Sequence, residues 1–381
     1  MIAFIQACGL YSYDHGGSAK ILRSLLAAGH PPVLSINTYF STTPGSLIGN
    51  ELQLPLRPGF GHLEFTRLHQ TLTLLDGTYR GQFEKKLRRA LAEHRIKLVH
   101  LLANTYSVVP VHNVVSQLGI PYVLSIHDDL EYVTGGHLLI KQMTAHIGSA
   151  WREARAAFVI SEELGREYSR RYGAREYRIV TDGLKCVADA PRRRPEKSLR
   201  LYFMGLFHNS YAPNLRAVLD ALKVVRSQHP DWEITVTCRC SAISAPVHAD
   251  DVPVRVLPFA PEAEVERDLL SADLLYQPMP FQAHALSFSR FSMSTKMITY
   301  LGSGLPIFFH GPDDAAACKL LARNEAAAIC TTLDPEEIAK CLLDAAAQRE
   351  IIVHRALALA RSQFLLADQQ RRFWEPILQA L

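Results

Sequence analysis

The sequence lacks any long apolar run, and no stretch reaches the ~18 residues that a membrane-spanning helix needs. It opens directly on the strand-like "MIAFIQACG", without a basic segment and cleavage site, so we expect no signal peptide. Excess charge is also scarce, because a formal net charge of +4 on 381 residues is too small to indicate nucleic-acid binding. We expect a cytoplasmic protein that can meet a membrane only from its surface.

Cysteine pairs and acidic clusters are scarce as well. The seven cysteines are scattered, and the only close pair is Cys238 and Cys240 in the apparent strand "WEITVTCRC". No second Cys or His pair follows at zinc-finger spacing, and no carboxylate-rich run resembles a magnesium or manganese site. We therefore expect reduced, mostly buried thiols and no bound metal.

What the sequence does contain is a regular alternation of short strands and helices. "IAFIQA", "KLVHLLA" and "IPYVLSIHD" read as strands between helical segments, and "LRLYFMG", "WEITVTC" and "PIFFHG" repeat the pattern later. The Pro-rich, charged stretch 189–198 separates the two series. This pattern predicts two α/β domains with doubly wound parallel sheets, at residues 1–188 and 199–364.

Ligands of such sheets bind beyond the carboxyl ends of the strands, so the residues there are candidates. Gly16 and Gly17 in "YSYDHGGSAK" follow the first strand and allow close backbone approach, although a tight turn with a helix cap explains them equally well. Their loop matches neither the dinucleotide fingerprint nor the ATP-binding P-loop. His127 ends the strand "VLSIH", where it can bond a substrate or be a surface histidine.

The stretch "FSMSTKMITYLGSGLP" predicts a helix of about two turns with an anion at its N-terminus. Ser294 and Thr295 suit an N-cap, and Lys296 and Arg290 add positive charge where the helix dipole already favours anions. We expect the Lys296 side chain to face solvent. In the second domain the loop "MGLFHNSYAPN" offers Gly205 for a turn and His208 and Asn209 as donors, with an ordinary loop as the alternative.

These motifs occur in the order seen in retaining GT-B glycosyltransferases of family 4, and the chain resembles that family over nearly its whole length. The resemblance implies two Rossmann-like domains facing a cleft and a final helix, about 365–381, that crosses back to the first domain. It also implies metal-independent transfer of a sugar from a nucleotide-sugar, UDP- or GDP-linked, to a glycan or lipid-linked acceptor, as in polysaccharide biosynthesis. No cofactor beyond this donor substrate is implied.

The resemblance also assigns roles to single residues. Gly16 and Gly17 would face the donor diphosphate or the acceptor, and His127 would lie against the transferred sugar as a catalytic residue. Lys296 would stabilise the charge that builds on the leaving phosphate. The remaining assigned positions would bind the donor. Its phosphates would be held by Arg290, Ser294 and Thr295. Further contacts to the donor would come from Gly205, His208 and Asn209.

The chain departs from the family at four places. Phe291 and Thr299 occupy the positions of the two usual glutamates, Leu206 that of an arginine, and Asn214 lies near that of a lysine. A subset of the family shares these replacements, which indicates divergence. Two alternatives stay open: a catalytically silent GT-B binding module, and a non-hydrolysing nucleotide-sugar epimerase, for which no matching set of charged residues is found.

Residues 79–97 predict a basic amphipathic helix. Its Phe83, Leu87 and Leu91 are spaced four apart and should pack on the sheet. Its basic residues are Lys85, Lys86, Arg88, Arg89, Arg95 and Lys97. Residues 1–190 hold 20 Lys and Arg against 16 Asp and Glu, whereas 191–381 hold 21 of each, so the first half carries all the excess. An ordinary surface helix and a contact with anionic lipid are both compatible with this pattern.

Overall fold

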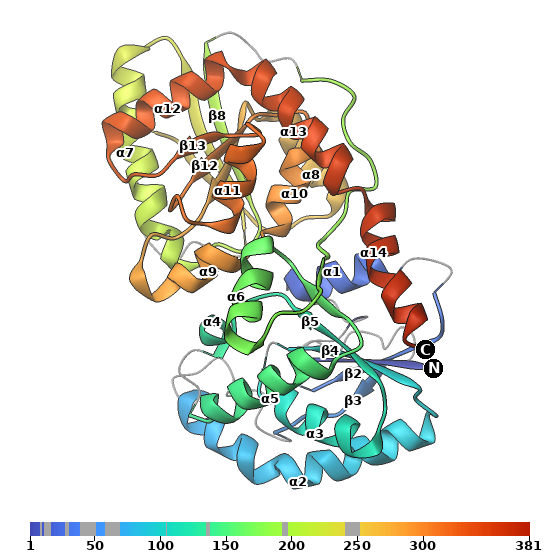
Figure 1. Ribbon diagram of the computed structural model, residues 1–381. Helices are drawn as coiled ribbons and strands as arrows, with labels where there is room; N and C mark the ends of the chain where they lie inside the picture. Colours follow the sequence, from blue (N-terminus) through green and yellow to red (C-terminus); the bar gives the residue numbers. More distant parts are fainter. Residues whose placement is uncertain are drawn as a thin grey trace. The chain divides into compact units, whose positions relative to one another are not determined.

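The structure is a computed structural model (Figure 1), in which the chain forms two compact units. Unit 1 comprises Met1–Gly183 and Leu366–Leu381, and unit 2 comprises Leu184–Leu365. The structure describes residues 1–7, 10, 17–26, 30–38, 51–57, 69–103, 105–134, 138–192, 197–240 and 252–381.

In the described part of unit 1, seven parallel strands form one sheet in the order β3-β2-β1-β4-β5-β6-β7. Every residue of β1, β2, β4 and β5 is buried, as expected for a parallel sheet that helices cover on both faces. The order reverses between β1 and β4, which makes a topological switch point there. The strands are β1 (Ile2–Gln6), β2 (Val33–Asn37), β3 (Glu51–Gln53), β4 (Leu98–Leu102), β5 (Tyr122–Ile126), β6 (Ala157–Val159) and β7 (Arg178–Ile179).

Helices of unit 1 connect these strands and pack against one another in two groups. Helices α2, α3 and α5 are neighbours, and α1 packs with α14, the last helix of the chain. Trp374 fastens α14 by donating its indole N–H to the carbonyl of Leu25 at 2.8 Å. The helices are α1 (Gly17–Leu25), α2 (His69–Glu93), α3 (Val108–Leu118), α4 (Leu130–Thr134), α5 (Ile140–Glu153), α6 (Glu162–Tyr172) and α14 (Leu366–Gln379).

Unit 2 repeats the design with six described parallel strands in the order β10-β9-β8-β11-β12-β13. The first strand, β8, lies between β9 and β11, so the chain changes direction across the sheet beside β8. The prediction of two doubly wound parallel sheets is therefore confirmed. The strands are β8 (Ser198–Met204), β9 (Glu233–Arg239), β10 (Val254–Leu257), β11 (Leu274–Pro278), β12 (Ile307–His310) and β13 (Ala328–Cys330).

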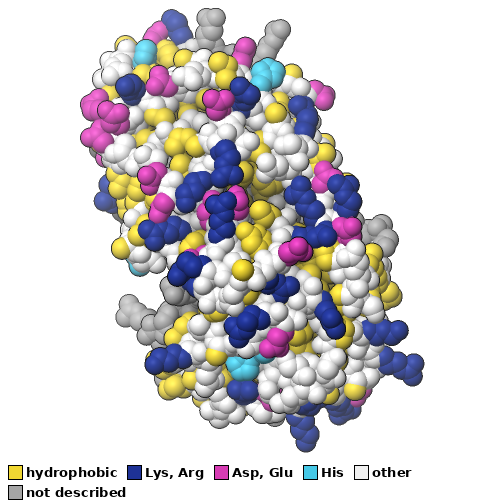
Figure 2. Space-filling model, in the orientation of Figure 1, with side chains coloured by type: hydrophobic (Ala, Val, Ile, Leu, Met, Phe, Trp, Pro, Cys, Tyr) yellow, Lys and Arg dark blue, Asp and Glu magenta, His cyan; other side chains and the backbone are white. Residues whose placement is uncertain are grey.

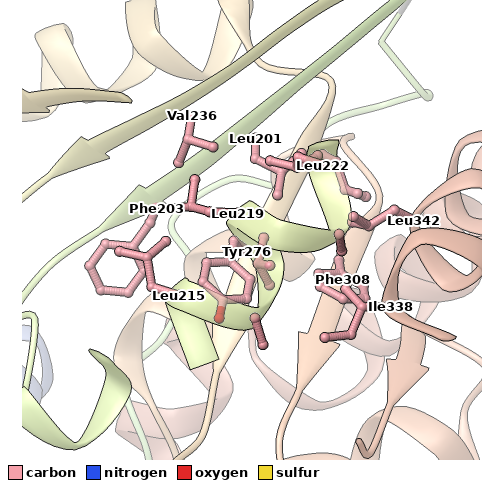
Figure 3. Close-up of a cluster of buried hydrophobic side chains, with 14 of the residues drawn as sticks. Leu201, Phe203, Leu215, Leu219, Leu222, Val236, Tyr276, Phe308, Ile338 and Leu342 are labelled. Atoms are coloured by element: carbon pink, nitrogen blue, oxygen red, sulfur yellow. The ribbon is translucent and has the colours of Figure 1, made fainter. Parts of the chain in front are cut away.

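Alternation of side chains along the strands gives unit 2 two cores. On one face α7 and α12 pack together over β8, and Leu219 and Leu222 belong to the same buried cluster as Leu342 and Ile338 (Figure 3). On the other face Tyr300 and Leu301 of α10 lie in a second cluster beside α13. The helices are α7 (Ala212–Gln228), α8 (Glu262–Ser271), α9 (Leu286–Phe291), α10 (Thr295–Leu301), α11 (Ala316–Arg323), α12 (Pro335–Ala347) and α13 (Arg349–Gln363).

The chain between the two sheets is tied to unit 2 rather than loose. The N–H of Ala188 donates to the carbonyl of Gly302, and the N–H of Arg192 donates to the carbonyl of Gly304, both at 2.9 Å. The Arg192 guanidinium also donates to the carbonyl of Ser303 at 2.7 Å. These bonds hold the beginning of the Pro-rich stretch against the turn that follows α10, so unit 2 starts before the predicted linker.

Several short elements were not predicted. The loop-rich stretch after β2 contains β3, and the two-turn helices α4 and α9 have no clear apolar period in the sequence. Helix α2 begins at His69, well before the predicted start; Gly77 and Gly81, a residue type of low helix propensity, weaken the helical pattern of its first half. No helix among the described residues is both long and apolar enough to span a bilayer.

Candidate functional site

The carboxyl end of β8 forms a sharp turn at the switch point of unit 2. Gly205 follows β8 with a φ of 101°, in the left-handed region that favours glycine. Its N–H donates to the carbonyl of Arg239, the last residue of β9, at 2.9 Å. The chain then enters a short 3-10 turn, Asn209–Tyr211, before α7. This is the position at which doubly wound sheets bind ligands.

Lys296 lies against this turn. A Cβ atom placed on Gly205 would lie 3.4 Å from Cε of Lys296, and the ammonium Nζ lies 4.4 Å from the ring centre of Phe203 and 5.1 Å from that of Tyr211. Such distances are typical of cation–π contacts. The prediction that Lys296 faces solvent is wrong, because its side chain is partly buried on two aromatic rings.

The electrostatics of this cluster depend on burial. Burial lowers the pKa of Lys296 to about 7, and the neighbouring Cys240 opposes that shift. Burial, and then the charge of Lys296, lower the pKa of His208 to about 4, so this imidazole is neutral at pH 7. Among the described residues no Asp or Glu forms an ion pair with Lys296. The cluster therefore presents one positive charge that an incoming anion can compensate.

For the other candidate residues of unit 2, the structure gives less support for a role in binding an anion. Ser294 is the N-cap residue of α10, as predicted, but its hydroxyl makes no capping hydrogen bond, and Thr295 is the first residue of the helix. Arg290 in α9 forms an ion pair with Asp314 at 2.5 Å, so its charge is already compensated. Asn209 is exposed on the 3-10 turn.

Asn214 has a structural role that the sequence did not suggest. Its side-chain amide is fully buried and donates to the carbonyls of Met279 at 2.9 Å and His310 at 3.1 Å. These carbonyls lie at the carboxyl ends of β11 and β12, so Asn214 joins α7 to this edge of the sheet. Asn214 thus supports this edge of the sheet.

In unit 1, His127 follows the last residue of β5 at the carboxyl edge of the sheet, as predicted. It is only 4% exposed, which rules out a surface histidine. Burial lowers its pKa to about 4, and its Nδ1 atom makes no hydrogen bond to any described residue. Gly17 begins α1 beyond β1 at the same edge. Gly16 lies outside the described residues.

Three residues near Lys296 were not singled out from the sequence: Phe203, Tyr211 and Tyr300. Phe203 and Tyr211 support the Lys296 ammonium, and the Tyr300 hydroxyl accepts a hydrogen bond from the N–H of Met204 at 3.0 Å. All three look like ordinary core residues in the sequence. Their only signal is that they flank the motifs already identified.

The described residues show where the thiols lie and whether acidic, histidine or cysteine side chains gather. Six cysteines are described, all with free thiols, and among these only Cys186 is exposed, so the prediction of mostly buried thiols is confirmed for them. Within the same described part of the chain, no group of three or more His, Cys, Asp or Glu residues is arranged to hold a metal ion.

Two doubly wound units in one chain, with candidate ligand residues at a carboxyl edge of each sheet, define the class: this is the GT-B fold. Comparison with known proteins agrees. Residues 19–181 match the family model described as a glycosyl transferase 4-like domain. The resemblance to family 4-like GT-B glycosyltransferases is thereby confirmed. No curated protein sequence matches the chain.

Solved structures support the same fold across both units. HepE from Anabaena, crystallised with UDP, aligns over 100% of both chains with a TM-score of 0.68 and 14% identity. A UDP-forming α,α-trehalose-phosphate synthase from Burkholderia vietnamiensis covers 98% of this chain, and 95% of its own, with a TM-score of 0.63 and 14% identity. The corresponding enzyme from Burkholderia xenovorans, in complex with glucose-6-phosphate, aligns over 99% of both chains (TM-score 0.66, 11% identity).

Proposed function

We propose that this protein is a glycosyltransferase that takes a sugar from a nucleoside-diphosphate sugar, with UDP or GDP as the nucleotide, and transfers it to a glycan or lipid-linked acceptor. The observation that carries the proposal is the Lys296 ammonium, which lies on Phe203 and Tyr211 beside the Gly205 turn without an acidic partner among the described residues. The glycosyl transferase 4-like match and the UDP-bound neighbour support a diphosphate as its ligand.

We infer the role of Lys296 in catalysis from the place at which negative charge develops during the reaction. Departure of the leaving group builds negative charge on the β-phosphate, and a fixed cation beside that phosphate stabilises the transition state more than the ground state. Lys296 would supply this charge and thereby take the place of a metal ion. His208 is neutral at pH 7, so it can donate one hydrogen bond to a phosphate oxygen without adding charge.

We further propose that configuration is retained and that His127 of unit 1 contacts the transferred sugar. The family resemblance supports retention. The Nδ1 atom of His127, buried and without a hydrogen-bond partner among the described residues, supports a role in binding a polar group. A buried polar atom without a partner costs stability, so it is expected where a ligand supplies the missing bond. The acceptor hydroxyl would then lose its proton to the departing phosphate.

Calorimetric titration with UDP and GDP tests the proposal. We expect one of them to bind in the presence of EDTA, and Lys296→Ala to weaken its binding about ten- to a hundredfold, because a charge-assisted contact contributes roughly 1.5–3 kcal/mol. The matched control is Lys319→Ala, an exposed lysine on α11. If neither these nor any other nucleoside diphosphate binds, the result would favour the alternative of a silent GT-B module.

A peripheral membrane contact through α2 is a separate proposal. Phe83, Leu87 and Leu91 are buried as predicted, so the helix turns its polar side outward. Lys85 and Lys86 are exposed, and Figure 2 shows Lys and Arg side chains along the edge over which Figure 1 draws α2. Each Lys or Arg near an anionic bilayer contributes ~1 kcal/mol, which would bring the protein to a lipid-linked acceptor.

Co-sedimentation with vesicles tests this contact. Binding should need phosphatidylserine, fall as salt is added, and disappear when Lys85 and Lys86 are replaced by Glu. A variant with Glu at Lys223 and Lys340, two exposed lysines of unit 2, has the same net charge and should still sediment. Equal binding by both variants, or none by the wild type at low salt, would leave a soluble acceptor.

A further inference from the structure

The main-chain N–H of Met204, the last residue of β8, has no strand partner. The next N–H, that of Gly205, points toward β9 and bonds the carbonyl of Arg239 at 2.9 Å. Successive N–H groups of a strand point to opposite sides, so the Met204 N–H points toward β11. Strand β8 pairs with β11 only at Leu201 and Tyr202, so this pairing ends before Met204.

A side chain of α10 supplies the hydrogen-bond acceptor that a neighbouring strand would otherwise provide. The Tyr300 hydroxyl oxygen accepts the Met204 N–H at 3.0 Å. Tyr300 is fully buried, and burial holds its pKa well above the ordinary value, so the group remains a neutral hydroxyl. The bond thus satisfies a donor that would otherwise be left unpaired at the end of a buried strand.

The same face of α10 carries Lys296. Residues four apart in a helix lie one turn apart on one side, so Lys296 and Tyr300 both face the end of β8. Tyr300 bonds Met204, and Cε of Lys296 lies beside the next residue, Gly205, 3.4 Å from the place that a Cβ atom would take there. Two successive residues of the chain are therefore held by two successive turns of one helix.

We propose that Tyr300 is a positioning residue of this site: its hydroxyl fixes the end of β8 to α10 and so sets the place of Lys296 relative to the Gly205 turn. This inference rests on the proposed function, because it takes the turn and Lys296 together as the binding place of a nucleoside diphosphate. Tyr300 does not touch that ligand. Without its hydroxyl, the Met204 N–H loses its acceptor and the turn can move away from Lys296.

Tyr300→Phe removes only the hydroxyl, and UDP and GDP are the probes. We expect calorimetry to show about five- to tenfold weaker binding of whichever nucleotide the wild type binds, because a turn that is no longer fixed must be ordered on binding, which costs up to the free energy of one buried hydrogen bond. The matched control is Tyr202→Phe, which removes another buried tyrosine hydroxyl of unit 2, bonded to Asp268 at 3.1 Å. It should lower the melting temperature comparably and leave nucleotide affinity unchanged.

Two further measurements separate positioning from general support of the fold. Hydrogen exchange at the amides of Met204 and Gly205 should accelerate in Tyr300→Phe and not in Tyr202→Phe. In a Lys296→Ala background, Tyr300→Phe should weaken nucleotide binding by less than twofold, because the group that it positions is gone. An equal loss in both backgrounds, or unchanged affinity in the single variant, would overturn the inference. If the wild type binds no nucleotide, the proposed function itself fails.

Discussion

Nucleotide affinity should fall as pH rises above 7, because the charge of Lys296 is lost in the free protein. Burial lowers the pKa of this ammonium to about 7, whereas a bound diphosphate favours its charged form. Above pH 7 the free protein must therefore take up a proton when it binds the nucleotide. Affinity should fall by up to a factor of ten per pH unit, or roughly 50-fold between pH 7 and 9.

Among the described groups near Lys296, His208 has a pKa of about 4 and stays neutral, and burial raises the pKa of the Cys240 thiol. The terminal phosphate of the nucleotide, with a second pKa near 6, is already fully ionised. The slope of affinity against pH between 7 and 9 therefore reports Lys296.

Calorimetry in two buffers of different ionisation enthalpy measures the proton uptake directly. The wild type should take up close to one proton at pH 8 to 8.5. Lys296→Arg is the control: a guanidinium stays charged at these pH values, so its nucleotide affinity should be nearly constant. A wild type whose affinity does not change between pH 7 and 9, with no proton uptake, would refute a role for the Lys296 ammonium.

Three further results are expected. His127→Ala should reduce sugar transfer at least tenfold while changing nucleotide affinity less than threefold, and steady-state kinetics with full activity would contradict the role of this residue. His100, His127 and His310 are buried with pKa values lowered by burial to about 3, 4 and 4, so the unfolded chain binds more protons below pH 6.5. The free energy of unfolding measured in urea should thus fall as pH drops from 6.5 toward 4, and a flat profile would show that these imidazoles are not buried. Leu222→Ala should lower the same quantity by about 2–5 kcal/mol, since Leu222 is fully buried under α12, and a loss below 1 kcal/mol would contradict that packing.

Much of the fold could be predicted because parallel strands buried on both faces leave a strong signal. "KLVHLLA" and "PIFFHG" are short apolar runs bounded by polar or turn residues, and both form strands where expected. Helices with one apolar face were equally clear, as Phe83 and Leu87 on α2 show. By contrast, α4 and α9 are too short to show a period, and tertiary contacts decide that they form.

The candidate site was predictable in position but not in detail. Carboxyl strand ends placed His127 and Gly205 correctly, because that rule depends only on topology. The environment of Lys296 could not be read from the sequence: Phe203 and Tyr211 lie far from it along the chain, and only the folded sheet brings their rings beneath the ammonium. Local sequence therefore predicted an exposed lysine where long-range packing partly buries one.

The most direct test of the account is a screen of UDP- and GDP-sugars for release of the free nucleoside diphosphate, with EDTA present throughout. We predict that the wild-type protein releases UDP or GDP from at least one donor, and that Lys296→Ala lowers the rate at least a hundredfold while Lys319→Ala does not. Release from every donor at the rate of a protein-free control, or an undiminished rate with Lys296→Ala, would contradict the claim that Lys296 serves the departing diphosphate.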